Sequence, residues 1–205
     1  LLKKNKADLW MSGHQKSSQQ IMIGYDGKAL ASRQLCWWRV RVWDGNGNKT
    51  RWSKPQRFAI GIIAPDTIKG DFIGMSSESD DAPLLRKQFT YERKSKAAFL
   101  HVNSMGYHEV YINGNKVGDA VLTPAVSQLD KRSLINTYDV TSLLHKGSNE
   151  IVICTAYGWF RTKAFGLKPD TPLVRAELDI LGDNGWECIL GTGADWQAAP
   201  SGYRD

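Results

Sequence analysis

The feature that most constrains the fold of this chain is the alternation of its apolar residues with a period of two. Leu35 to Trp43 show it most clearly. One face of this segment carries Leu35, Trp37, Arg39, Arg41 and Trp43, and the other carries Cys36, Trp38, Val40 and Val42. Successive side chains of a strand point to opposite faces, so we expect the wholly apolar second face to point to a core. Because helical periodicity is nearly absent, the sequence predicts an all-β protein.

The first segment contains only part of a familiar strand set. The turn residues Asp44 to Asn48 predict a hairpin, with the chain returning as a strand from Trp52 to Ile60. Gln20 to Tyr25 form another run that ends in a turn signal. An immunoglobulin-like or fibronectin-like sandwich needs about seven strands, which is more than this segment offers. We therefore expect an incomplete sandwich whose opening strands lie upstream.

A linker and a change in charge divide the chain. Gly61 to Asp71 contain a proline and no periodic apolar pattern. Residues 1–62 hold 12 Lys or Arg and 3 Asp or Glu, whereas residues 63–205 hold 15 and 18. The basic residues are spread singly along strand-like segments, which favours a solvated strand face over nucleic-acid binding. We predict two domains, residues 1–62 and 63–205.

The second segment is also rich in β-patterns. Hairpin signals stand at Asn113 to Asn115 and at Gly182 to Gly185. Tyr138 to Leu144 resemble a capped helical turn. Strands are predicted over residues 84–89, 97–103, 107–112, 116–118, 150–156, 173–181 and 186–190. About eight strands in this length are typical of a jelly-roll β-sandwich.

The cysteine and histidine patterns provide no metal motif. Cys36, Cys154 and Cys188 form no C-x-x-C pair, so free thiols are the favoured interpretation and a Cys154–Cys188 disulfide stays open. The four histidines lack zinc-ligand spacing. No apolar run is long enough for a membrane-spanning helix, so membrane insertion is not expected.

No catalytic residue is predicted. A glycosidase needs two carboxylates across the scissile bond, and none of the 18 acidic residues after residue 62 stands in such a motif. Nucleophile elbows, P-loops and dinucleotide-binding glycine motifs are absent from the sequence.

A carbohydrate-binding site is the remaining candidate. Tyr157, Trp159 and Arg161 follow a predicted strand, and sugar sites combine aromatic planes with fixed polar groups. Trp159 or Phe160 as plain core residues is the alternative. Asp119 and the cluster Asp130 to Arg132 are candidate polar contacts, for which surface salt bridges are the competing interpretation.

These motifs together resemble the N-terminal region of bacterial α-L-rhamnosidases. Residues 37–44 and 52–55, preceded by 8–13, resemble the fibronectin-like module of that family. The rhamnosidase N-terminal module is matched, in the same order, by residues 82–89, 106–119, 121–124, 130–132, 137–141 and 158–161. The resemblance covers nearly the whole chain.

The resemblance implies a galactose-binding-like jelly roll after the fibronectin-like sandwich, and further downstream an (α/α)6 barrel that hydrolyses terminal α-L-rhamnose with inversion. This chain would then be non-catalytic, with the rest of the parent chain and a rhamnose-containing polysaccharide or glycoside as partners. A periplasmic or secreted parent is favoured over a cytoplasmic one. Some jelly rolls of the family bind L-rhamnose with calcium, which here would use Asp119. Ala120 stands where an amide ligand is expected, and Leu167 to Pro172 offer backbone carbonyls.

The sequence leaves three hypotheses open. The chain binds rhamnosylated substrate near a distant active site, it is a purely structural pair of β-sandwich modules, or it is a stand-alone carbohydrate-binding or adhesion protein.

Overall fold

The protein is described by a computed structural model covering residues 6–64, 68–75, 81–162 and 170–204. The chain divides into two compact units, Leu1–Ile63 and Ala64–Asp205. Regular structure in the described ranges is almost entirely antiparallel β-sheet, which confirms the all-β prediction. No helix within these ranges has the length and apolar character needed to cross a membrane.

The first unit is built on one strand pair. β1 (Leu35–Trp38) and β2 (Gln56–Ala59) are antiparallel, with Cys36 opposite Phe58. The predicted turn forms: the Asp44 carboxylate accepts from the backbone N–H groups of Asn46 and Asn48 at 2.9 and 2.8 Å. These hydrogen bonds and the Asn48 side chain stabilise the charged form, so the pKa of Asp44 lies below its usual value.

One expectation for this unit is wrong in the structure. Of the apolar face predicted to point to a core, only Cys36 is buried, at 3% exposure, whereas Trp38 is 49% and Val42 58% exposed. The other face is the better covered one, because its cations interleave with aromatic rings. The guanidinium of Arg41 lies 4.5 Å from the Trp52 ring centroid and 5.0 Å from that of Trp43.

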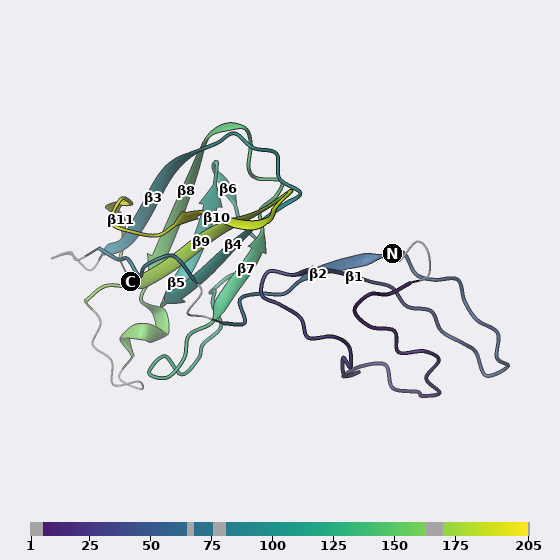
Figure 1. The fold of residues 1–205 in the computed structure, drawn as a ribbon. Helices are drawn as coiled ribbons and strands as arrows, with labels where there is room; N and C mark the ends of the chain where they lie inside the picture. The colour runs from purple at the N-terminus through teal and green to yellow at the C-terminus, as the bar shows by residue number, and fades with distance from the viewer. Residues whose placement is uncertain (1–5, 65–67, 76–80, 163–169, 205) are drawn as a thin grey trace. The chain divides into compact units, whose positions relative to one another are not determined.

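The second unit is a sandwich of two antiparallel sheets (Figure 1). The four-stranded sheet has the order β10-β9-β4-β7 and the five-stranded sheet the order β11-β3-β8-β5-β6. The strands are β3 (Asp81–Tyr91), β4 (Ala97–Met105), β5 (Tyr107–Ile112), β6 (Asn115–Lys116), β7 (Ile135–Asp139), β8 (Gly147–Ala156), β9 (Leu173–Gly182), β10 (Gly185–Gly191) and β11 (Gln197–Arg204).

The core of this unit lies between the two sheets. Alternate residues of each strand point inward, as in Ile151 and Ile153 of β8 and Leu178 and Ile180 of β9. Each of these four side chains is at most 1% exposed. Burial of such side chains stabilises the fold by about 2 kcal/mol each, which makes this interface the main source of stability in the unit.

The strand predictions for this unit were largely confirmed, with two differences. Both predicted hairpins form, β5 with β6 and β9 with β10. The segment predicted as a helical turn instead starts as the last residues of β7, which ends at Asp139. The chain turns only after Asp139, whose carboxylate accepts from the Thr141 N–H at 3.1 Å. β11 was not predicted. All three cysteines are free, so the disulfide alternative is not supported.

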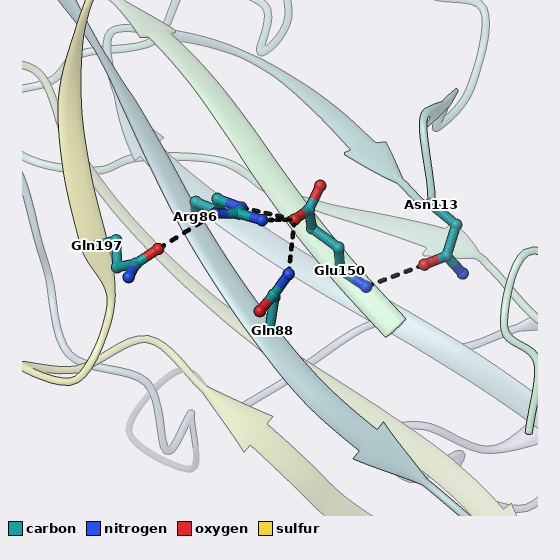
Figure 2. A network of polar contacts seen from close by, with 5 residues as sticks. All are labelled: Arg86, Gln88, Asn113, Glu150 and Gln197. Atoms are coloured by element: carbon teal, nitrogen blue, oxygen red, sulfur yellow. Dashed lines mark hydrogen bonds and ion pairs between the residues drawn. The ribbon is translucent and has the colours of Figure 1, made fainter. Parts of the chain in front are cut away.

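A polar network covers part of the outer face of the five-stranded sheet (Figure 2). The Glu150 carboxylate on β8 accepts from the Arg86 Nε–H at 2.5 Å and from the Gln88 amide at 3.4 Å, both from β3. The Glu150 backbone N–H donates to the Asn113 side chain at 2.9 Å. This face alternates with the apolar core face, so the period-two pattern places these polar side chains on the opposite side from the core.

A second polar network is buried beside the core. The Ser104 hydroxyl donates to the Gly106 carbonyl at 2.9 Å and lies 2.7 Å from His108 Nδ1. The hydroxyl of Tyr138 lies 3.1 Å from His108 Nε2. Because the Ser104 hydroxyl proton is donated to the Gly106 carbonyl, the hydroxyl can only accept from His108. His108 Nδ1 therefore carries the imidazole proton, and Nε2 accepts from the Tyr138 hydroxyl. Burial lowers the pKa of His108 to about 4.

This buried histidine predicts acid sensitivity. Between about pH 6.5 and 4 the unfolded chain binds a proton at His108 that the folded chain excludes, so stability falls as pH falls through this window. We expect His108→Gln to remove roughly one proton of uptake on unfolding, measured from the pH dependence of urea unfolding. His145→Gln, an exposed histidine, is the control and should leave the slope unchanged. Equal slopes in wild type and His108→Gln would contradict the assignment.

Candidate carbohydrate-binding site

The candidate site forms where β8 ends. The strand stops at Ala156, and the chain turns into the 3-10 helix η3 (Gly158–Arg161). β5 begins beside it, with Tyr107 paired to Ala156. Loops at the ends of a rigid sandwich are a common place for binding residues, and this end of the sheet holds the predicted site segment.

Two glycines allow the strand end to pack tightly. Gly158 has φ +47°, and a Cβ atom there would lie 2.5 Å from the Tyr107 ring. Gly106 has φ +115°, and a Cβ atom would lie 2.3 Å from the Ala156 carbonyl oxygen. The ring of Tyr107 therefore lies directly against the backbone from which η3 begins.

Tyr157 anchors the segment. Its side chain is buried, and its hydroxyl donates to the Asp170 carbonyl at 2.6 Å. The Arg161 guanidinium carbon lies 4.2 Å from the Tyr157 ring centroid. A cation held over an aromatic face is stabilised by the ring quadrupole, so the position of Arg161 is set by Tyr157. The structure thus brings these two predicted site residues together.

The sequence left open whether Trp159 or Phe160 is a core residue, and the structure distinguishes them by their exposure. Phe160 is buried at 6% exposure, whereas Trp159 is 51% exposed. The turn of η3 is closed by the Thr162 hydroxyl, which donates to the Trp159 carbonyl at 3.0 Å. Phe160 is the core residue, and the Trp159 indole offers an accessible aromatic surface.

Asp119 lies apart from this cluster in the hydrogen-bonding pattern. It follows β6 on an exposed loop, and among the described residues no hydrogen bond or ion pair joins it to Tyr157, Trp159 or Arg161. The predicted polar cluster Asp130 to Arg132 folds as a turn, in which the Arg132 side chain donates to the Gln128 side-chain oxygen at 3.0 Å. The calcium site at Asp119 stays a prediction. Of the carbonyls considered for it, those of residues 167–169 lie outside the described residues.

A buried polar cluster on the four-stranded sheet was not predicted from the sequence. His101, Glu177 and Asp179 are each 1% exposed, and their ligand-type atoms lie within 4.8 Å of one another. The Thr137 hydroxyl lies 2.8 Å from His101 Nδ1, and the Lys69 N–H donates to Glu177 at 2.7 Å. One polar atom on each of the His101 and Glu177 side chains therefore already has a hydrogen-bond partner within the protein.

The thiol of Cys188 lies close to this cluster. Burial raises its pKa to about 11, and the nearby carboxylates of Asp179 and Glu177 act in the same direction. Cys188 is therefore a protonated, unreactive thiol at neutral pH.

Comparison with known proteins shows the family. The family model for the alpha-L-rhamnosidase N-terminal domain matches residues 93–205, which are more than half of the chain. This chain belongs to the α-L-rhamnosidase N-terminal domain family. Residues 1–64 match the model of the Rha78A-like N-terminal immunoglobulin domain. The resemblance inferred from the sequence motifs is thereby confirmed.

Curated relatives and solved structures agree. Alpha-L-rhamnosidases of Formosa agariphila and an Alteromonas species are 30% and 31% identical over 97% and 95% of this chain. Alpha-L-rhamnosidases from Dictyoglumus thermophilum and Aspergillus terreus superpose with TM-scores of 0.81 and 0.79, at 26% identity over 97% and 94% of this chain. The chain spans only 23% of each of the two curated relatives and 24% of each of these structures.

Proposed function

We propose that this chain is a non-catalytic region of an α-L-rhamnosidase, and that its second unit binds rhamnose-containing glycan at the end of β8. Hydrolysis of terminal α-L-rhamnose would take place in a catalytic domain outside these residues. The observation that carries the binding proposal is the half-exposed Trp159 in the same turn of η3 as Arg161, whose guanidinium packs on the Tyr157 ring.

The chemistry of these two side chains suits a deoxysugar. L-Rhamnose has a C–H face and a methyl group that can pack on an indole, and hydroxyls that can accept hydrogen bonds from a guanidinium. Arg161 is positioned by Tyr157 before any ligand arrives, so binding would not need to order it.

We expect Trp159→Ala to weaken L-rhamnose binding about fivefold, because a stacking contact of this kind contributes on the order of 1 kcal/mol. The measurement is isothermal titration of the chain with L-rhamnose, with and without calcium. Trp37→Ala is the matched control, because Trp37 is similarly exposed, at 53%, but belongs to the first unit. Its affinity should equal that of wild type.

The calcium arm of the titration tests Asp119. If this carboxylate binds the ion, Asp119→Ala removes any calcium dependence of the rhamnose affinity. If wild type releases no heat with or without calcium, the binding proposal fails, and the purely structural alternative replaces it.

A further inference from the structure

A pocket outside the candidate sugar site opens at the other end of β8. It lies between the loop that joins β3 to β4, residues 92–96, and the loop that joins β7 to β8, residues 140–146 (Figure 1). Tyr91 at the end of β3 pairs with Gly147 at the start of β8, so the two loops meet at this end of the sandwich. Because β8 has 10 residues, its two ends lie roughly 30 Å apart, and the pocket is separate from η3.

Tyr91 lines this pocket and carries a buried hydroxyl without a partner. The residue belongs to the hydrophobic core and is 6% exposed. Its hydroxyl oxygen has no hydrogen-bond partner among the described residues. The pKa of Arg93 is raised mainly by its hydrogen bond to Glu187 and, to a smaller degree, by the charge of an ionised Tyr91, so the hydroxyl end of Tyr91 lies near Arg93. A buried hydroxyl without a partner is unfavourable, and phenylalanine would fill this core position without that cost.

The lining of the pocket supplies cations around this hydroxyl. Lys94 is exposed and makes no ion pair or side-chain hydrogen bond with any described residue. The Lys146 side chain is 79% exposed and lies 3.6 Å from the Glu92 carboxylate, which is a loose ion pair. The Arg93 guanidinium is held by two hydrogen bonds to Glu187, at 2.7 and 2.9 Å. Three cations thus surround one buried hydroxyl donor, and this arrangement favours a negatively charged group as the ligand.

The pocket also presents acceptors, which a simple inorganic anion would not use. The His145 Nδ1–H donates to the Lys146 carbonyl at 3.1 Å, so Nε2 of the neutral ring is an acceptor. The Glu92 carboxylate is another acceptor, and Leu144 adds an apolar wall. The volume of about 370 Å³ lies in the range of small-molecule sites. Donors for a carboxylate beside acceptors for hydroxyls fit a ligand that carries both groups on one sugar ring.

We propose that this pocket binds a uronic acid, a sugar whose ring carries a carboxylate. The Tyr91 hydroxyl donates to the sugar carboxylate, and Lys94 and Lys146 neutralise its charge. The ring hydroxyls donate to Glu92 and to His145 Nε2. This ligand is an acidic sugar, whereas the ligand proposed for the end of β8 is a neutral one. The two proposals rest on different residues, so either can fail without the other.

Titration of the chain with D-glucuronate, followed by the NMR shifts of its backbone amides, tests the proposal. We expect shifts in residues 92–95 and 141–146 and none in η3. Tyr91→Phe and Lys94→Ala should each weaken binding about tenfold, because each removes a hydrogen bond to a charged group. Lys54→Ala is the control, because this exposed lysine belongs to the first unit, and its affinity should equal that of wild type. Shifts confined to η3, or no shifts at all, would overturn the proposal.

Thermal unfolding separates a binding role of the Tyr91 hydroxyl from a structural one. Without sugar, Tyr91→Phe should keep or raise the melting temperature, because the hydroxyl has no partner among the described residues. A fall of several degrees would show that the hydroxyl supports the fold, and its role in binding would be wrong.

Two further ligands identify which part of the sugar is recognised. Methyl D-glucoside lacks the carboxylate, and inorganic sulfate lacks the sugar ring. We expect D-glucuronate to bind at least tenfold more tightly than either of them. Equal affinity for the glucoside would show that the negative charge is not recognised. Equal affinity for sulfate would show that the ring hydroxyls are not recognised, and each of these results would overturn the assignment to a uronic acid.

Discussion

Asn149→Ala is expected to lower the free energy of unfolding of the second unit by about 3 kcal/mol. The Asn149 side chain is 2% exposed and makes four hydrogen bonds. Its amide donates to the carbonyls of His145 and Gly147 at 2.7 and 3.0 Å. Its oxygen accepts from the His145 N–H at 3.1 Å and from the Asn113 amide at 2.9 Å. Alanine would leave these donors and acceptors without their partners in a partly buried site.

The effect should extend beyond the loop because Asn149 supports a second amide. Asn113, at φ +51° in the hairpin between β5 and β6, donates to the Leu143 carbonyl at 2.9 Å. Its oxygen accepts from the Glu150 N–H, the contact drawn at one end of the network in Figure 2. The two asparagines thus connect the hairpin to the loop that precedes β8.

The measurement is urea unfolding followed by tryptophan fluorescence. Asn115→Ala is the control, because Asn115 is exposed in the same hairpin and makes one local contact, from its amide to the Asn113 carbonyl at 3.1 Å. It should cost less than about 0.5 kcal/mol. A loss below about 1 kcal/mol for Asn149→Ala would show that the loop relaxes to satisfy its own backbone groups.

The sequence predicted strands well where one face is buried and the other is solvated. β5 alternates between buried and partly exposed residues, and its bounds, Tyr107–Ile112, agree with the predicted run. β11 escaped prediction because most of its residues are exposed and it is held by backbone pairing with β3. β7 was misassigned in part because an Asp side chain that accepts from a following N–H is common to helix starts and to turns.

The site was predictable in location but not in the role of each residue. A short aromatic segment after a strand marks a strand-end site, yet spacing alone could not separate exposed Trp159 from buried Phe160 in a single turn of 3-10 helix. The cluster of His101, Glu177 and Asp179 was missed because both faces of β4 and most of β9 are buried. Its polar residues therefore stand in strands without the alternation that marks a solvated face.

Gly106→Ala is the second substitution with a large expected effect, a loss of about 3 kcal/mol in the free energy of unfolding. The backbone at Gly106 has φ +115°, a region that side chains rarely adopt, and the new Cβ would lie 2.3 Å from the Ala156 carbonyl oxygen. That oxygen belongs to the paired end of β8, so it cannot move without disturbing the pairing with β5. The Ser104 hydroxyl, which donates to the Gly106 carbonyl, would also lose its geometry.

Gly185→Ala separates the strain from the clash. Gly185 has a similar φ of +105°, but no other heavy atom lies within 4 Å of the Cβ position. It should lose only the conformational part, about 1 kcal/mol. The difference between the two variants in urea unfolding therefore measures the close contact at the end of β8. Because the same strand end leads into Tyr157 and η3, Gly106→Ala should also weaken any ligand bound at Trp159, whereas Gly185→Ala should not. Equal losses for the two variants would mean that the strand end is free to shift, and a freely shifting strand end could not hold Arg161 in place for a sugar.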